Sequence, residues 1–351
     1  MIRSSALYIS LIVSILIVLV CGSMLMIGYT YKMQERKQQR ASILQSNVAS
    51  GMEILLLERF RVDSLQKLSL FGTDHDSVAL FKKAWGVYES ATVKSWIGHD
   101  SLAKAFLIGS ALNDTLKVLY LADEDRPMSI SGKSLIKGTA YLPKSGIKAA
   151  YVESAGYNDR TLVYGKIKDS DRALPEPDPE IVKNLQMLFA AEPDQKISSA
   201  TGNLRNLPDT VTNSFFHPVK WIRAGKKELL LSAIKASGNV IFSSDSLIVV
   251  NANASLDGVI LLAPQVRIES NFRGSLQVIA TDSVTVGDSV KLDYPSALLV
   301  LKKDTDKFQA KISIGKDAVI SGQLFAWEKE RSLLMPIISV GESSTIKGEV
   351  W

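Results

Sequence analysis

The chain has 351 residues, of which 46% are hydrophobic, and this composition excludes an intrinsically disordered protein. Its length predicts about two or three folded units. The 41 basic and 36 acidic residues nearly cancel, and the last 123 residues hold 12 basic and 13 acidic side chains. Because phosphate binding requires clustered cations, this balance argues against a nucleic-acid partner.

Cysteine and histidine are too scarce to suggest a metal centre. The one cysteine, Cys21, lies within an apolar run, so it has neither a disulfide partner nor other thiolates near it in sequence. His75 stands between Asp74 and Asp76, but a solvated turn explains this triplet better because a fourth ligand is missing. Two further histidines are isolated in the sequence: His99 and His217. We therefore predict no metal and no cofactor.

The amino-terminal segment has the properties of a membrane anchor. Residues 4–31 carry no charge, and about 20 apolar residues are enough to cross a bilayer as a helix. A signal peptide has a shorter apolar core of roughly 7 to 15 residues. We therefore expect residues 4–31 to be retained as a single transmembrane helix.

The helix is expected to continue beyond the anchor as a polar stem. Residues 32–60 lack proline, and apolar Leu44, Val48, Met52 and Leu55 recur at spacings of four and three. This spacing places one apolar stripe on a helix. Anchor and stem together predict one helix of about 55 residues.

This arrangement resembles the amino-terminal segment of the minor pseudopilins of type IV pili and type II secretion systems. The likeness covers residues 1–60 and rests on the apolar helix followed by a stem that is highly polar at residues 34–40. The chain departs from the pattern in lacking a basic leader before Arg3 and a Glu early in the apolar run. The resemblance implies an inner-membrane anchor, with the folded part outside the cytoplasm, whose helix can pack against other helices in a filament.

The charges that flank the anchor favour the opposite orientation. Only Arg3 precedes the apolar run, whereas four basic residues follow it within residues 32–40. The positive-inside rule therefore places the bulk of the chain in the cytoplasm. We expect a single-pass inner-membrane protein that is mainly periplasmic, and the orientation stays open between these two readings.

Residues 63–125 change from helical to alternating periodicity, which predicts an antiparallel β region. Segments rich in β-branched and aromatic residues lie at 77–81, 85–88, 103–108 and 116–121. Turn-forming residues separate them, as at 98–100. A long helix followed by such a meander is also the plan of pilin-like proteins.

A degenerate repeat dominates the carboxyl-terminal half. Residues 312–322 (ISIGKDAVISG) align with residues 338–348 (ISVGESSTIKG) at an offset of 26 residues. Short apolar strands that end in Gly, Asn or Ser cannot bury their inward side chains alone and must stack on copies of themselves. We therefore predict a parallel β-helix and disfavour a Greek-key sandwich. Further copies lie at residues 129–141, 256–262, 266–274 and 284–292.

Side-chain directions within the β-helix follow from strand alternation. Ile312 and Ile314 are expected to point inward and Ser313 to face water. Gly315 is expected to turn the corner with a positive φ. The last copy ends at Trp351 without a polar cap, so we expect that a loop or another molecule covers that end or that the chain has been cut short.

The phrase of strand, Ile-x-Gly and strand also resembles bactofilins, bacterial cytoskeletal proteins whose parallel β-helices polymerise end to end. The likeness covers residues 247–351. It implies a cytoplasmic, membrane-bound scaffold.

An insertion separates the early copy from the main array. Asp178 is a helix N-cap and Pro179 a first-turn proline, which predicts a helix to about Ala191. Its apolar stripe is expected to pack on the flank of the β-helix. Three aromatic residues after the helix are expected to be buried in the first strand of the array or to form a contact surface: Phe215, Phe216 and Trp221.

We therefore expect a mainly β protein in five parts. The segments are residues 1–62 (transmembrane helix and stem), 63–125 (antiparallel β region), 126–170 (first β-helix coils), 171–228 (helical and loop insertion) and 229–351 (parallel β-helix).

Catalysis has little support in the sequence. Asp282, Asp288 and Asp293 fall near predicted corners, where turns ordinarily use aspartate. A nucleophile elbow and a phosphate loop are both missing. We expect a non-enzymatic, membrane-anchored structural or assembly component of the bacterial envelope, pseudopilin-like, with protein partners at the stem and the β-helix end. The alternatives are a bactofilin-like scaffold and, less favoured, a glycan-binding or glycan-cleaving β-helix protein.

Overall fold

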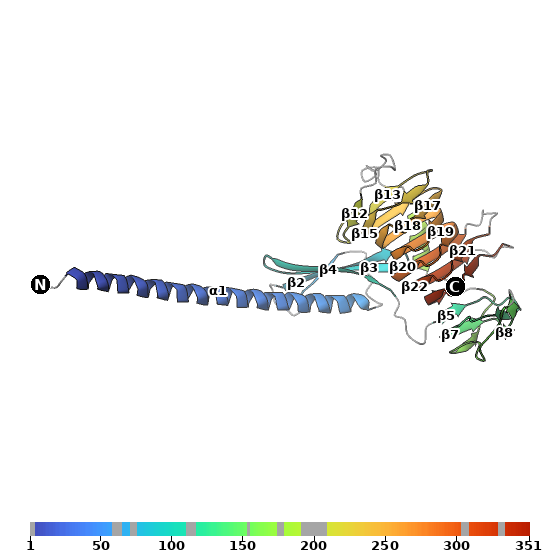
Figure 1. The fold of residues 1–351 in the computed structure, drawn as a ribbon, viewed down its shortest axis with the longest axis horizontal. Helices are drawn as coiled ribbons and strands as arrows, with labels where there is room; N and C mark the ends of the chain where they lie inside the picture. The colour runs from blue at the N-terminus through green and yellow to red at the C-terminus, as the bar shows by residue number, and fades with distance from the viewer. Residues whose placement is uncertain are drawn as a thin grey trace. The chain divides into compact units, whose positions relative to one another are not determined.

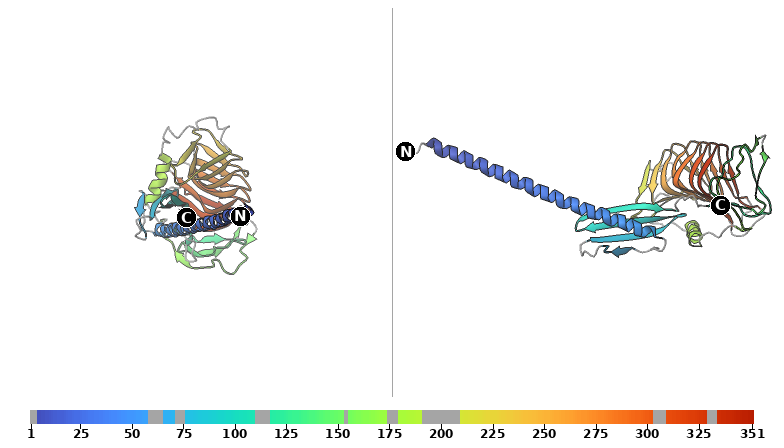
Figure 2. Two further views of the ribbon diagram at one scale, coloured as in Figure 1. Left: turned by 90° about the vertical axis from the view of Figure 1, so that its left-hand side faces the viewer. Right: turned by 90° about the horizontal axis from the view of Figure 1, so that it is seen from below.

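The structure is a computed structural model that describes residues 4–57, 65–70, 76–109, 117–152, 155–173, 179–190, 209–302, 309–328 and 334–351. The chain divides into two compact units (Figures 1 and 2). The smaller unit comprises Met1–Lys83 and Ala91–Phe106, and the larger comprises Ala84–Ser90 and Leu107–Trp351.

The smaller unit combines one long helix with the strands of an antiparallel sheet. Helix α1 (Ser4–Leu56) has 53 residues, which confirms that the segments predicted as anchor and stem form one continuous helix. The strand order is β1-β2-β3-β4, and Lys67 of β1 lies opposite Ala79 of β2 in an antiparallel pair. Two-residue turns join β2 to β3 and β3 to β4, a connection that only antiparallel strands allow. The strands are β1 (Gln66–Leu68), β2 (Asp76–Trp85), β3 (Tyr88–Ile97) and β4 (Asp100–Ile108).

The stem half of α1 packs on this sheet (Figure 2). Leu44, Val48 and Leu55 are buried, as the apolar stripe requires. A Cβ at Gly51 would lie 2.8 Å from Val93 Cγ1 and 3.0 Å from Leu80 Cδ2, so the missing side chain allows the close approach. The stripe therefore has a partner in its own unit.

The larger unit is built on a 16-stranded, mostly parallel sheet. Every described pairing within 229–351 is parallel. The strand order runs from β11 to β12, and the described strands do not close it into a ring. Its strands are β5 (Lys117–Tyr120), β7 (Thr139–Leu142), β11 (Ile167–Asp169), β12 (Thr210–Asn213), β13 (Lys220–Arg223), β14 (Leu229–Leu231), β15 (Lys235–Gly238), β16 (Val240–Ser243), β17 (Leu247–Val250), β18 (Ser255–Ile268), β19 (Arg273–Val286), β20 (Lys291–Lys302), β21 (Lys311–Ile314), β22 (Val319–Glu328), β23 (Ile337–Val340) and β24 (Thr345–Val350).

Copies of the sequence repeat are hydrogen-bonded neighbours in this sheet. Ile312 pairs with Ile338 at the predicted offset, and Val284 pairs with Ile312 on the other side. Ile312 is fully buried and Ile314 is 5% exposed, whereas Ser313 is half-buried. This burial confirms the predicted inward positions of Ile312 and Ile314. Because the copies are aligned, equivalent side chains form columns inside the array.

The corner residues differ from those expected. Gly315 does not have a positive φ; Asp317, two residues later, has φ 55°. Ser289 and Ser343 occupy the same place in neighbouring copies, with φ 57° at both. Gly315 is needed for another reason, because a Cβ there would lie 2.7 Å from the carbonyl carbon of Gly287. The repeated glycine therefore allows successive corners to stack closely.

Strand β5 stacks on the carboxyl-terminal edge of the array, and β7, at the end of the early copy, stacks on β5. Leu119 of β5 pairs in parallel with Val350 of β24, and Ala140 of β7 pairs with Leu119 on the other side. Two expectations differ from the structure: β5 pairs in the parallel sheet and not in the antiparallel region, and the edge at β24 is covered by a strand of the same chain and not by a loop or another molecule. Two-stranded ladders flank this region: β6 (Met128–Ile130) with β8 (Ile147–Ala149), and β9 (Tyr151–Val152) with β10 (Ala155–Gly156).

The outer face of the array is covered by apolar side chains from outside it. Helix α2 (Pro179–Ala190) forms as predicted, and its Leu185 is 1% exposed. The hairpin tip at 84–90 contributes Trp85 and Tyr88, and Trp85 Nε1 donates a hydrogen bond to Gly258 O at 3.0 Å. Residues 85–88, predicted as a strand, therefore form the end of β2, a turn and the start of β3. Strands β12 and β13 also join the sheet, within residues expected to be an insertion.

Candidate functional site

The candidate metal ligands do not assemble within the described residues. Asp74 and His75 lie outside those residues, and so does the side chain of Asp76. His99 and His217 are both exposed on turns or loops. In the described ranges, no three His, Cys, Asp or Glu side chains are grouped as metal ligands.

The three corner aspartates have separate local roles. Asp282 Oδ1 accepts a hydrogen bond from Thr281 Oγ1 at 2.7 Å. Asp288 Oδ1 accepts one from the Lys316 backbone N–H at 2.8 Å, and Asp293 lies 3.8 Å from Lys291 Nζ. No described hydrogen bond joins two of these carboxylates. Their contacts are those of turn and surface residues.

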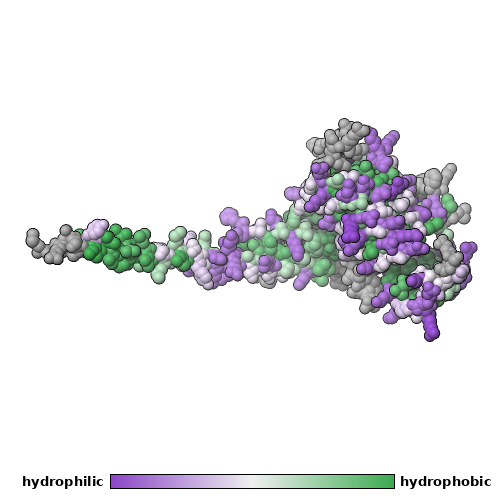
Figure 3. Space-filling model, viewed as in Figure 1, coloured by the Kyte–Doolittle hydropathy of each residue, from purple (hydrophilic) through white to green (hydrophobic). Residues whose placement is uncertain are grey.

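The apolar half of α1 is a candidate membrane-contacting surface. This helix is long and apolar enough to cross a membrane. The apolar side chains between Leu7 and Ile27 are exposed, and Val18 and Leu25 are 70% and 77% exposed. Figure 3 shows this half as a continuous hydrophobic surface. Cys21 is exposed on the same segment.

The larger unit also contains a polar-rimmed cavity of about 230 Å³. Its wall is formed by the end of α2, by strand β13, by the end of β16 with the corner that follows, and by strands β18 and β19. The lining residues are Leu188, Phe189, Trp221, Arg223, Ser243, Ser244, Asp245, Leu262, Ala263, Pro264 and Thr281. Apolar and polar groups therefore line the same small space.

Strand alternation places Ser243 on the face of β16 that borders this cavity. Val240 and Phe242 of β16 belong to the internal core, whereas Ile241 packs in the outer cluster beneath α2. Ser243, two residues after Ile241, lies on the outer face as well. In the parallel ladder Ser243 pairs with Leu262, which also lines the cavity.

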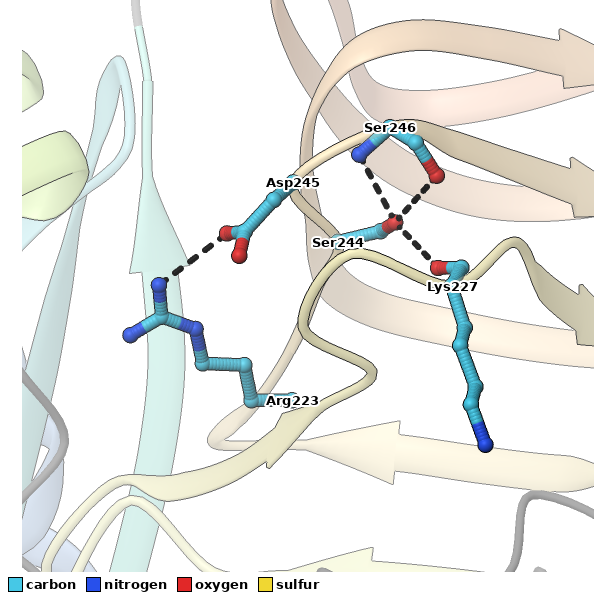
Figure 4. A network of polar contacts seen from close by, with 5 residues as sticks. All are labelled: Arg223, Lys227, Ser244, Asp245 and Ser246. Carbon is cyan, nitrogen blue, oxygen red and sulfur yellow. Dashed lines mark hydrogen bonds and ion pairs between the residues drawn. The ribbon is translucent and has the colours of Figure 1, made fainter.

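An ion pair forms part of the rim (Figure 4). Arg223 Nη2 donates to Asp245 Oδ1 at 3.0 Å, and each side chain is a little over 40% exposed. The two residues come from β13 and from the corner after β16. These strands are paired in parallel, with Arg223 opposite Ser243. The sheet therefore brings together Arg223 and Asp245, which lie 22 residues apart in the sequence.

The corner that carries Asp245 is held by its own hydrogen bonds (Figure 4). Ser244 Oγ donates to the carbonyl oxygen of Lys227 at 2.8 Å and accepts from the Ser246 N–H at 3.1 Å. The Asp245 N–H donates to Gly225 O at 2.7 Å. These bonds fix the backbone that presents Asp245.

Ser243 differs from its neighbour in having an unpaired hydroxyl. Ser243 is 8% exposed, and its buried Oγ has no hydrogen-bond partner among the described residues. Such groups are uncommon in folded proteins because losing hydration without replacement is unfavourable. Ser243 is therefore a residue of the cavity wall whose hydroxyl has hydrogen-bonding capacity that no described residue uses.

Sequence reasoning singled out Trp221 but missed Arg223, Ser243 and Asp245 as parts of one site. The signal was weak, because recognising it required the strand repeat to be extended to residues 210–250, where the repeat phrase is absent. Comparison of the chain with protein-family models, curated proteins and solved structures gives no significant match.

Proposed function

We propose that the protein is a non-enzymatic, membrane-anchored assembly component of the bacterial envelope, similar to minor pseudopilins. The division of α1 carries this proposal: its first half exposes a continuous apolar surface, whereas its second half packs on an antiparallel sheet. An exposed apolar helix needs a bilayer or other apolar helices around it. The same helix can therefore anchor the protein and contact partner helices.

We further propose that the larger unit is a parallel β-helix that presents a rigid surface. Three successive strands, β12, β13 and β14, pair in parallel with the three that follow them, β15, β16 and β17. All three of the latter pair with segments of β18. This succession is expected when a chain coils so that each turn stacks on the previous one. A stack of this kind is suited to a structural role.

Orientation is the first test. We propose that both folded units lie in the periplasm, as the pseudopilin-like anchor implies. Alkaline phosphatase fused after Trp351 should then be active in cells, and a reporter that works only in the cytoplasm should be inactive at the same position. The reverse pair of results would place the bulk of the chain in the cytoplasm. A bactofilin-like membrane-bound scaffold would then be the better proposal, consistent with the basic residues that follow the anchor.

Assembly through α1 is the second test. Cys21 is exposed on the apolar half and provides a native crosslinking site. Bismaleimide treatment of membranes should link Cys21 to a neighbouring chain that carries a cysteine, and Cys21→Ser should abolish this product. Gln45, exposed on the stem, provides a second site when Gln45→Cys is made in the Cys21→Ser background. Failure at both positions, while a known membrane complex is trapped in the same sample, would identify a solitary anchored protein.

A further inference from the structure

We propose that the cavity bounded by Trp221, Arg223 and Asp245 binds a single uncharged sugar ring, either free or at the end of a glycan chain. This inference concerns the larger unit alone and goes beyond the proposed assembly role. It rests on the size of the cavity, its mixed lining, its internally neutralised charge and one unpaired buried hydroxyl.

The size of the cavity limits the ligand. About 230 Å³ lies below the roughly 300–1,000 Å³ of pockets that hold drug-sized ligands. A single six-membered ring with its substituents is of this size class.

The polar groups suit a ligand that both donates and accepts hydrogen bonds. A guanidinium carries five N–H groups, so the bond from Arg223 to Asp245 Oδ1 leaves donors available. An ionised carboxylate accepts several hydrogen bonds, so Asp245 can also accept from a ligand hydroxyl. Ser243 Oγ adds a buried hydroxyl that lacks a partner among the described residues. Sugar hydroxyls can satisfy all three groups.

The apolar lining suits the carbon-bound hydrogens of a sugar ring. Trp221 and Leu262 belong to the outer apolar cluster and also line the cavity, as does Phe189 at the end of α2. Binding sites for small molecules commonly combine aromatic walls with a few polar groups that fix orientation. A pyranose has C–H faces and a hydroxyl rim, which match these two kinds of lining.

The charge of the site favours a neutral ligand over a charged one. Arg223 and Asp245 are 3.0 Å apart and neutralise each other. An anion would be attracted to Arg223 but repelled by Asp245, and a cation would meet the opposite pair of forces. An amino acid zwitterion would have to separate the ion pair to engage both charges. A neutral polyol can bind while the pair stays intact.

Binding can be tested with the full chain in detergent by saturation-transfer NMR and calorimetry. The probes are methyl β-D-glucopyranoside, its galacto epimer and N-acetyl-D-glucosamine, with D-glucuronate and glycine as charged comparators. At least one neutral ring should bind saturably with a dissociation constant of about 1 mM, because so small a ligand makes few contacts. Tighter binding of chitotetraose than of N-acetyl-D-glucosamine would indicate that the ring is recognised at the end of a chain.

Variants distinguish this cavity from nonspecific binding. Trp221→Ala and Ser243→Ala should each weaken binding by tenfold or more, the first by removing the aromatic wall and the second by removing the hydroxyl. The matched control is Arg172→Ala, which removes an exposed Arg–Asp pair elsewhere in the same unit and should leave binding unchanged. Circular dichroism and thermal unfolding verify that each variant is folded.

Three results would overturn the proposal. The first is folded wild-type protein with no saturable binding of any neutral ring up to about 20 mM. The second is a preference for glucuronate or glycine over the neutral rings, which would point to a charged ligand. The third is binding that folded Trp221→Ala and Ser243→Ala retain at the wild-type affinity, which would place the sugar elsewhere.

Discussion

Trp351 stacks on Tyr120, with ring centroids 5.9 Å apart and ring planes only 10° apart. Tyr120 stacks in turn on Tyr141 at 5.3 Å, and Lys117 Nζ lies 5.3 Å from the centre of the Trp351 ring. These side chains join the last strand of the array to β5, where the backbone ladder pairs Val350 with Leu119. The short ladder makes the aromatic column an important part of this junction.

We predict that Trp351→Ala loosens the junction between β24 and β5. Loss of the half-buried indole removes the ring contact with Tyr120 and the cation–π contact with Lys117, at a cost of about 2 kcal/mol. Hydrogen exchange should accelerate in β5 and β7 while β18 and β19 keep their protection. Tyr151→Ala, which removes a 75% exposed ring, is the control and should change neither region.

The sequence was sufficient to predict those features that depend on local or repeated patterns. The register of Ile312 with Ile338 followed from two copies of one phrase, and the start of α2 at Pro179 followed from a helix-start signal. The pairing of Val350 with Leu119 could not be predicted in this way, because nothing in the sequence around either residue indicates that the two strands are neighbours. This pairing depends on which free edge of the sheet β5 can reach in three dimensions.

The candidate cavity was hidden for a related reason. Arg223 and Asp245 meet because β13 and β16 are stacked, and the segments that carry them lack the phrase Ile-x-Val-Gly.

The positive φ at Asp317 was also missed, because glycine was expected wherever the chain turns. Asp, Asn and Ser can adopt this conformation at modest cost, so the corner does not require glycine. Contacts between stacked copies determine where glycine is required.

The interior of the array can be tested with a matched pair of substitutions. Ile314→Asp would place a carboxylate in the buried core, where no described group can pair with it, and should destabilise the larger unit by several kcal/mol. Ser313→Asp, at the adjacent half-buried position on the other face, should cost less than about 1 kcal/mol. Thermal unfolding of both variants measures the difference, and equal losses would contradict the assigned faces.

The corners allow a second comparison, between Gly315 and Asp317. Gly315→Ala should destabilise the larger unit by about 1–3 kcal/mol, because the added Cβ would lie 2.7 Å from the Gly287 carbonyl carbon. Asp317→Gly should be neutral or should stabilise by up to about 1 kcal/mol, because glycine adopts φ 55° without strain. Denaturant unfolding should rank the two variants in this order. The opposite order would mean that φ, and not close stacking, limits the corner sequence.

The packing of the stem depends on Gly51. Gly51→Leu should destabilise the smaller unit by about 2–3 kcal/mol, because the new side chain would collide with Val93 and Leu80. This loss would exceed the gain of about 1 kcal/mol expected from replacing glycine inside a helix. Gln45→Leu, at an exposed position of the same helix, is the control. Faster hydrogen exchange in β3 for Gly51→Leu alone would support the described packing, whereas equal exchange in both variants would contradict it.

The pH dependence of stability should reveal the buried hydroxyl of Tyr88. Tyr88 is 4% exposed, and its Oη donates a hydrogen bond to Ser296 O at 2.8 Å. Burial, and then the negative charges that Tyr294 and Glu349 can carry, raise the pKa of Tyr88 well above its usual value of 10.0. Because the neutral phenol is favoured in the folded state, its contribution to stability is fully present below about pH 10 and is lost as the pH rises from there towards the folded-state pKa.

Tyr88→Phe should cost about 1–2 kcal/mol at pH 7, because the phenol's hydrogen bond to Ser296 O is lost. The gap in unfolding free energy between wild type and Tyr88→Phe should narrow between about pH 10 and 12. Urea unfolding across this range, with Tyr151→Phe as the exposed control, measures the gap; a constant gap would show that Tyr88 ionises as readily in the folded protein as in the unfolded chain.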